Sequence, residues 1–134
     1  MPGEKNDLIN IENWNELLHC FGKDGVPVPF VREIFLLDCM VAGTGYVDDI
    51  EAKTASLSAG SVVGLLREPG NRYDPQAILV LNAKGEKIGY IPRDDNPVLA
   101  RLMDAGKLLY GKVKDKSSGR SWLYILIEVC MKDF

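Results

Sequence analysis

The residues best suited to chemistry stand in one short stretch, Leu65 to Val80, which reads LLREPGNRYDPQAILV. Two cations, an amide, an aromatic ring and a carboxylate occur there within eight positions, as Arg67, Asn71, Arg72, Tyr73 and Asp74. Cations and amides contact phosphate oxygens, and an exposed ring can stack on a base. We therefore interpret the stretch as a binding site for a short nucleotide chain, not as a catalytic site.

The residues on either side predict how this site is positioned. Residues 62–66 and 77–80 are rich in β-formers, so we expect a strand, a polar loop and a second strand. Two prolines fix φ at the shoulders of the loop, and its Asn and Asp side chains can bond their own backbone. Asp74 precedes Pro75, which favours an extended backbone and turns the carboxylate back under the loop. A capped β-hairpin with a solvated tip would show the same composition.

Composition predicts one globular domain. The chain has 134 residues, of which 46% are hydrophobic, and its longest apolar run is far too short to span a membrane. Cys20, Cys39 and Cys130 are an odd number without Cys-x-x-Cys spacing, so we expect reduced thiols. His19 is the one histidine, which leaves no ligand set for zinc. No secretory signal is recognisable, so we expect a cytoplasmic protein with no metal, no cofactor and no membrane partner.

Charge is distributed unevenly along the chain. The formal net charge is −3. Residues 1–59 hold 4 Lys and Arg against 10 Asp and Glu, whereas residues 60–120 hold 11 against 7. A locally basic face on an acidic body suits a short polyanion without coating long duplex nonspecifically. A solvated lysine-rich face would give the same count.

The N-terminal third predicts a helix followed by a strand. Apolar residues recur at nearly helical spacing over residues 7–22, and two prolines make residues 25–29 an extended connector. Phe35 to Val47 reads as a long strand, and residues 50–60 as a weak helix or a loop. We expect residues 1–40 to pack as a helix and connector on a β-barrel domain formed by residues 41–134.

The C-terminal half predicts three strands around a helix. Lys87 to Arg93 reads as a strand, and a helix should begin with Asn96 as its N-cap and stop at Gly106. Strands over 108–114 and 122–131 follow. The expected class is mainly β (α+β), a small, strongly curved antiparallel barrel of about six strands with two flanking helices. Side chains fill a barrel of this size, so a ligand must bind at its rim or outer face.

Three sequence segments, in the order REPGNRYDPQAILV, GEKIGYIPR and NPVLARLMDAG, resemble the HIRAN domain. The likeness runs from about Val41 to about Val129. That family occurs as a small bacterial module and at the N-terminus of helicase-like ATPases that remodel stalled replication forks. The resemblance implies an OB-like barrel without catalytic activity that binds the 3′-hydroxyl end of single-stranded DNA in DNA repair. It also implies a helicase or a nuclease as a partner protein.

Carried over by position, the resemblance implies roles for single residues. Tyr73 would be a stacking platform, Asp74 the carboxylate near the 3′ end, and Asn71 a loop or phosphate contact. End-binding relatives have an Arg-Tyr-Tyr run where this chain has Gly45-Tyr46-Val47, so Tyr46 is the matching aromatic residue and one cation is missing. Arg72, Arg93, Lys112 or Lys114 could replace that cation, and Trp122 occupies the place of an aromatic residue on the last strand. The expected nucleic-acid contacts are therefore Tyr46, Arg67, Asn71, Arg72, Tyr73, Asp74, Arg93, Lys112 and Trp122.

Two other functions fit the sequence less well. In an adaptor domain, the N-terminal helix around Trp14, Leu17 and Phe21 would bind a partner protein and the barrel would be an inert scaffold. An enzyme would need a phosphate-binding loop or a nucleophile paired with a base, and the chain shows neither pattern. We therefore expect a binding module.

Overall fold

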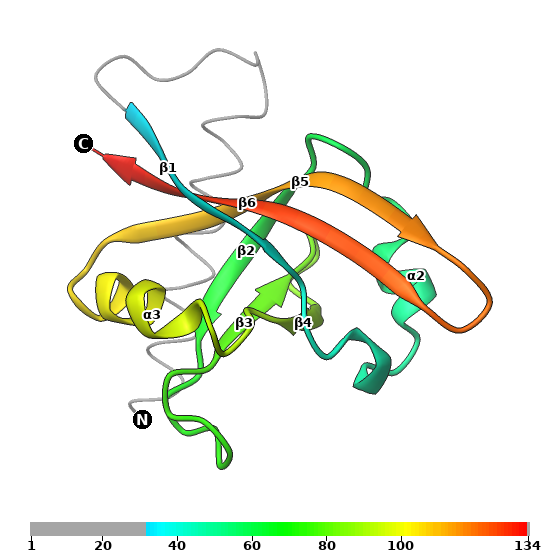
Figure 1. Ribbon diagram of the computed structural model, residues 1–134, viewed down its shortest axis with the longest axis horizontal. Coiled ribbons are helices and arrows are strands. Elements are labelled where there is room, and N and C mark those ends of the chain that lie inside the picture. Colours follow the sequence, from blue (N-terminus) through cyan, green and yellow to red (C-terminus); the bar gives the residue numbers. More distant parts are fainter. Residues whose placement is uncertain (1–31, 134) are drawn as a thin grey trace.

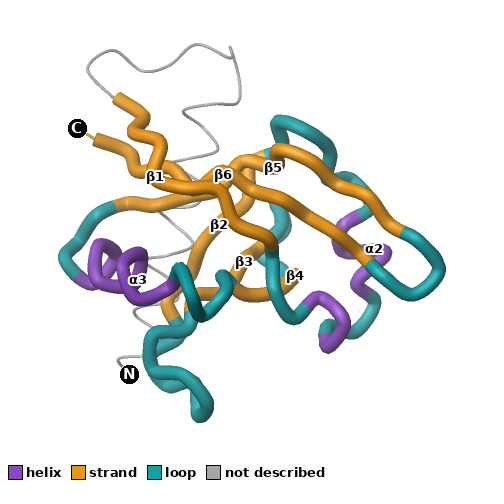
Figure 2. Tube along the Cα trace, viewed as in Figure 1, coloured by secondary structure: helices purple, strands orange, loops and turns teal. Residues whose placement is uncertain are grey.

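The computed structural model describes residues 32–133, which are mainly β-structure (Figures 1 and 2). The predicted helix over 7–22 and the connector over 25–29 lie outside the described residues. The elements in chain order are β1 (Arg32–Met40), the 3₁₀ helix η1 (Thr44–Tyr46), α2 (Ile50–Thr54), β2 (Val62–Arg67), β3 (Ile78–Leu81), β4 (Lys87–Tyr90), α3 (Asn96–Asp104), β5 (Leu108–Ser118) and β6 (Leu123–Asp133).

All of these strands belong to one antiparallel sheet with the order β1-β6-β5-β2-β3-β4, which confirms the predicted class and six strands. The sheet curves strongly (Figure 1). The OB-like barrel is not fully closed, because β1 and β4 share no continuous ladder. Instead, Ala42 and Tyr90 form a single isolated bridge, with both N–H···O distances at 2.8 Å.

The segment after β1 explains this incomplete closure. The predicted strand over Phe35–Val47 ends at Met40, because Gly43 takes a left-handed φ of 73° and turns the chain into η1. A Cβ atom on Gly89 would lie 2.5 Å from the carbonyl oxygen of Ala42. Only glycine permits so close an approach of two backbones, so Gly89 is what allows β4 to meet this segment.

One hydrophobic core lies on the inner, concave side of the sheet. Its fully buried members include Val63 of β2, Ile78 of β3, Ile88 of β4, Leu99 of α3 and Ile127 of β6. Burial of each such side chain stabilises the fold by about 1.5–3 kcal/mol. Because these core residues hold the strands in place, they also fix the positions of the loops that connect the strands.

Helix α3 packs on this core through Leu99 and Ala100. The predicted helix is confirmed, although Asp95 takes the N-cap position and Asn96 is the first helical residue. Pro97 stands in the first turn, where its missing N–H costs no helical hydrogen bond. Asn96 is 2% exposed, and its side chain is free to bind the loop between β2 and β3.

Strands β5 and β6 form a long hairpin of 11 residues each, longer than the sequence predicts. A register shift lies between Val113 and Asp115. Figure 1 shows the far end of the hairpin lying beside α2. Cys39 and Cys130 are buried free thiols. Within residues 32–133, no helix is long and apolar enough to cross a membrane.

Candidate nucleic-acid interface

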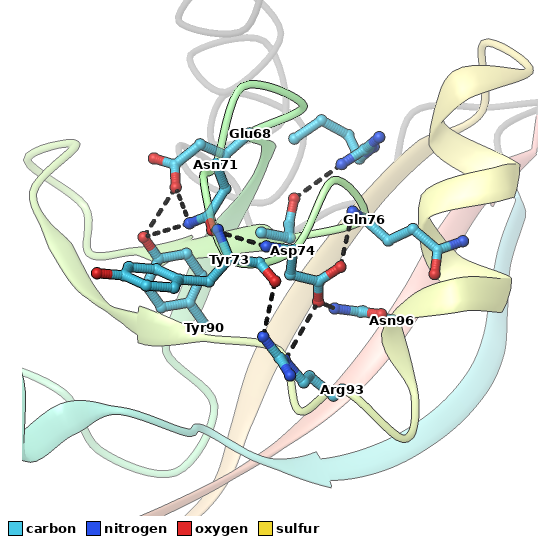
Figure 3. A network of polar contacts seen from close by, with 10 residues as sticks. Glu68, Asn71, Tyr73, Asp74, Gln76, Tyr90, Arg93 and Asn96 are labelled. Atoms are coloured by element: carbon cyan, nitrogen blue, oxygen red, sulfur yellow. Dashed lines mark hydrogen bonds and ion pairs between the residues drawn. The ribbon is translucent and has the colours of Figure 1, made fainter.

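The loop between β2 and β3 is fixed by the side chain of Asn71. Its Oδ1 accepts the backbone N–H of Tyr73 at 2.8 Å and of Asp74 at 3.0 Å, which is an Asx turn (Figure 3). Backbone bonds close the base of the loop, from the N–H of Glu68 to the carbonyl of Ala77 at 2.9 Å and from Asn71 to Glu68 at 3.0 Å. The prediction that Asn71 bonds its own backbone is confirmed.

Arg67 supports this loop from inside the molecule. Its Nε and Nη2 donate to the carboxylate of Asp104 in α3 at 2.9 and 3.2 Å. Its Nη1 donates to the carbonyl of Ala77 at 2.9 Å, and Nη2 to that of Pro75 at 3.1 Å. The side chain is 14% exposed. The guanidinium that we expected to contact nucleic acid is therefore engaged in holding the loop to β2 and α3.

Asp74 joins the loop to α3. Its Oδ1 accepts the backbone N–H of Gln76 at 2.9 Å, its Oδ2 accepts Nδ2 of Asn96 at 2.8 Å, and Nε of Arg93 lies 3.7 Å away. The hydrogen bonds from Asn96 and from the backbone of Gln76 lower the pKa of the Asp74 carboxyl. Figure 3 shows the carboxylate turned toward Asn96 and Arg93. The expectation that this carboxylate bonds within the fold is confirmed.

Tyr73 presents the exposed ring of the loop. Its residue is 77% exposed, while its carbonyl accepts Nη2 of Arg93 at 2.9 Å. The guanidinium carbon of Arg72 lies 5.7 Å from the centre of the ring. Arg93 itself is 70% exposed at the side chain. The loop therefore presents one solvent-facing aromatic ring, with the guanidinium of Arg72 near the ring and that of Arg93 at its backbone carbonyl, which suits a base and its adjoining phosphates.

A polar network below this ring was missed by the sequence analysis. Oε1 of Glu68 accepts Nδ2 of Asn71 at 2.7 Å and the hydroxyl of Tyr90 at 2.8 Å. Nζ of Lys87 donates to that hydroxyl at 3.2 Å and lies 4.5 Å from the centre of the Tyr90 ring. Lys87 therefore adds a third cation close to the loop. The pattern GEKIGYIPR marks a strand but gives no sign that its tyrosine reaches the β2–β3 loop.

Tyr46 and Trp122 lie at a different place on the fold. Tyr46 ends η1 and is 94% exposed. Trp122 is 57% exposed and lies against Gly119, where an added Cβ would be 2.2 Å from its Nε1. An open groove of about 550 Å³ runs along this region, lined by Thr44, Gly45, Ile50, Glu51, Thr54, Lys116, Ser118, Gly119, Arg120, Ser121, Trp122 and Leu123. Among the described residues, none from the β2–β3 loop lines it.

Lys112 and Lys114 belong to neither place. Lys112 donates to Glu33 of β1, and Nζ of Lys114 donates to Asp38 of β1 at 2.8 Å. The hydrogen bond and the charge of Asp38 raise the pKa of Lys114. Both lysines therefore lie across β6 from their acids, on the convex side of the sheet. The structure brings together Asn71, Arg72, Tyr73, Asp74 and Arg93 but not the whole predicted set.

No metal cluster is present in the part of the chain that the structure describes. Over residues 32–133, no three His, Cys, Asp or Glu side chains converge in a way that could hold an ion.

A curved antiparallel sheet with an aromatic and basic loop at its rim defines a small OB-like binding domain. The family model of the HIRAN domain matches residues 34–132, so the chain belongs to the HIRAN domain family. This confirms the resemblance inferred from the sequence.

Two longer proteins contain a region that is similar in sequence to this chain. The chain is 37% identical over 80 residues to helicase-like transcription factor of Oryctolagus cuniculus, which covers 58% of this chain and 8% of that protein. It is 39% identical over 72 residues to the Fanconi-associated nuclease 1 homolog of Oryza sativa subsp. japonica, which covers 52% of this chain and 7% of that protein. The chain thus spans less than a tenth of the length of either protein.

Two solved structures are similar in fold. A protein from Lactobacillus plantarum superposes with a TM-score of 0.72 at 36% identity, over 78% of this chain and 99% of that one. The HIRAN domain of human HLTF superposes with a TM-score of 0.58 at 23% identity, over 75% of this chain and 78% of that one. These comparisons establish the fold that carries the loop.

Proposed function

We propose that this domain is a non-catalytic module that binds single-stranded DNA at its 3′ end, with the β2–β3 loop as the contact surface. The observation that carries the proposal is the exposed ring of Tyr73 on a hydrogen-bonded loop, with Arg72 near the ring and Arg93 bonded to the carbonyl of Tyr73. A ring stacks on any base, so it gives affinity without sequence readout. The guanidinium groups supply the contacts to phosphate oxygens.

In this proposal, the predicted site residues have two kinds of role. Tyr73, Arg72 and Arg93 touch the DNA. Arg67 is a positioning residue, because its hydrogen bonds are made to the loop and to Asp104 of α3, and Asp74 likewise joins the loop to α3. Asp74 has a second role in the proposal: a carboxylate accepts about four hydrogen bonds and Asp74 accepts two within the fold, so an acceptor position is left for a terminal hydroxyl. That site would favour a 3′-hydroxyl over a 3′-phosphate.

The groove at Trp122, which lies apart from the β2–β3 loop, is the second contact surface of the proposal. Within residues 32–133, the exposed aromatic side chains are Phe35 in β1, Tyr73 in the β2–β3 loop, Tyr46 and Trp122. Arg120 and Lys116 line the same groove. We assign this groove to nucleotides further from the 3′ end. Lys112 makes no direct contact in this proposal and contributes only to the overall positive charge.

The proposal also includes the partner protein and the process in which the domain acts. The curated relatives are a helicase-like transcription factor and a nuclease homolog, and each is far longer than the matched region. A domain that recognises a DNA end would direct such an activity to its substrate during DNA repair or at a replication fork. We therefore propose a helicase or a nuclease as the partner protein.

Fluorescence anisotropy with short oligonucleotides labelled at the 5′ end tests this function. One oligonucleotide carries a free 3′-hydroxyl and its twin a 3′-phosphate, and both are titrated at low salt. We expect the free end to bind at least about tenfold more tightly, because the phosphate adds like charge beside Asp74. Equal affinity would contradict capture of the end, and no binding of either would contradict DNA binding.

A further inference from the structure

The side chain of Tyr90 reaches from the β2–β3 loop to the segment at which the groove begins. At its hydroxyl end, it donates to Oε1 of Glu68 at 2.8 Å and lies 3.4 Å from Nδ2 of Asn71, both in the β2–β3 loop. Near the base of the ring, a Cβ atom on Gly43 would lie 3.8 Å from Cδ2 of Tyr90. Residues 44–45 follow directly and line the groove. The two surfaces to which we assign contacts with DNA are therefore joined by one ring.

Lys87 is held against this ring. Its Nζ lies 4.5 Å from the ring centre and donates to the hydroxyl of Tyr90 at 3.2 Å. In a regular strand, two residues three positions apart point to opposite faces. Here Lys87 pairs with Leu81 and Tyr90 with Leu79, so the strand β4 holds one extra residue, and this bulge brings both side chains to one face. The bulge thus fixes an ammonium group beside the β2–β3 loop.

Lys87 has partners of a different kind from those of neighbouring cations. Lys116 in the groove donates to backbone carbonyls at and just after the end of α2, and Arg67 is paired with a carboxylate of α3. Among residues 32–133, Lys87 forms no ion pair, and the nearby carboxylate of Glu68 accepts the hydroxyl of Tyr90 instead. An ammonium group has more donors than one hydrogen bond uses. The exposed Lys87 therefore keeps donors for a ligand.

We propose that Lys87 binds a phosphate of the DNA strand where the strand passes from the β2–β3 loop toward the groove at Trp122. This contact rests on the proposed binding of single-stranded DNA and makes the loop and the groove one continuous track. A contact to phosphate oxygens positions a strand without reading its bases. Tyr90 is a positioning residue, because its ring and hydroxyl hold the ammonium group in place and less side-chain freedom is lost on binding.

The salt dependence of affinity tests this contact, with a labelled oligonucleotide of about 10 nucleotides, which is within the site size of an OB fold. Lys87→Met keeps the apolar stem and removes the charge, whereas Lys87→Arg keeps the charge. Lys84→Met is the matched control, because Lys84 is exposed in the turn between β3 and β4.

We expect Lys87→Met to lower affinity by about threefold to tenfold and to reduce the slope of log K against log salt by about 0.7, as for one lost phosphate contact. Lys87→Arg and Lys84→Met should keep the slope of the parent. A parental slope in Lys87→Met, or equally reduced slopes in Lys87→Met and Lys84→Met, would overturn the assignment of Lys87.

The proposed function is judged separately in the same titrations. It stands if the parent binds and Tyr73→Ala weakens binding, whatever Lys87→Met does. If the parent binds no oligonucleotide, both the function and the contact of Lys87 are contradicted.

Stoichiometry tests whether the loop and the groove bind one strand. We expect one strand per domain at saturation, with an affinity that falls in both Tyr73→Ala and Trp122→Ala. Two strands per domain, or an affinity that Trp122→Ala leaves unchanged, would contradict the continuous track.

Discussion

Tyr73 and Trp122 are both exposed aromatic residues, but they stand on connections that are built differently. The β2–β3 loop is fixed by the Asx turn of Asn71, by four donor contacts from Arg67 and by the link from Asp74 to Asn96. At the tip of the β5–β6 hairpin, the backbone hydrogen bond from the N–H of Gly119 to the carbonyl of Trp122, at 2.9 Å, closes the turn. A ring that is already held in place loses less freedom on binding, so the two rings should contribute unequally.

The largest difference should be seen in stability. Asn71→Ala removes three short side-chain bonds of the loop, to the N–H groups of Tyr73 and Asp74 and to Glu68. We expect it to lower the free energy of unfolding by about 2–3 kcal/mol, since a hydrogen bond contributes about 1 kcal/mol. Ser121→Ala at the hairpin tip is the matched control and should change it by less than about 0.5 kcal/mol. Urea unfolding measures both, and equal losses would mean that the loop is no more fixed than the tip.

The next difference concerns affinity for single-stranded DNA. Tyr73→Ala should weaken binding by roughly tenfold to a hundredfold, because stacking on a fixed ring contributes about 1–3 kcal/mol. Trp122→Ala should cost no more than about tenfold, at the lower end of the same range. Tyr73→Phe keeps the ring and should bind as the parent does. Anisotropy titration of the three variants decides, and a larger loss for Trp122→Ala would place the main contact in the groove.

A smaller effect should separate the cation beside Tyr73 from a cation elsewhere. Arg72 lies 5.7 Å from the ring centre, whereas Arg101 is an exposed residue of α3. Arg72→Ala should lower affinity by about threefold to tenfold and reduce the slope of log K against log salt by about 0.7, as for one lost phosphate contact. Arg101→Ala removes the same charge and should leave the slope unchanged. Identical slopes in the two variants would show that Arg72 does not contact phosphate.

The smallest effect is the pH dependence that Asp74 gives to the loop. Its hydrogen bonds lower the folded-state pKa below the ordinary value of about 3.9. The folded state therefore binds this proton less readily than the unfolded state, and the resulting stability is present above pH 4 and lost as the pH falls through the lowered pKa. Asp74→Asn should flatten the fall in melting temperature between about pH 4 and pH 2. An unchanged profile would show that the carboxylate does not hold the loop to α3.

Local features of this fold follow from the sequence, and long-range ones do not. The Asx turn, the helix after Asp95 and the flanking strands are decided by residues close in sequence, such as Asn71 and Pro97. The bonds from Arg67 to Asp104 and from Tyr90 to Glu68 join residues 37 and 22 positions apart, so they appear only once the sheet is folded. Arg67 and Tyr90 are of residue types that often contact ligands, so the sequence alone does not reveal that they bond within the fold.

The strand pairing explains the other misplaced residues. Lys112 was expected at the site as a possible replacement for the cation missing beside Tyr46, but its neighbour across β6 is Glu33, 79 positions earlier. The true end of β1 depended on Gly43 taking a positive φ, which glycine permits without requiring it. The boundary between residues 40 and 41 stays a prediction, although β1 itself pairs with β6.

A titration of the ¹⁵N-labelled domain with a short oligonucleotide that carries a 3′-hydroxyl tests the central claim most directly. The account predicts that the largest amide chemical-shift changes fall on Arg72, Tyr73, Asp74 and Arg93, with smaller changes around Trp122. Changes confined to other parts of the sheet, with the amides of the β2–β3 loop unmoved at saturation, would contradict it.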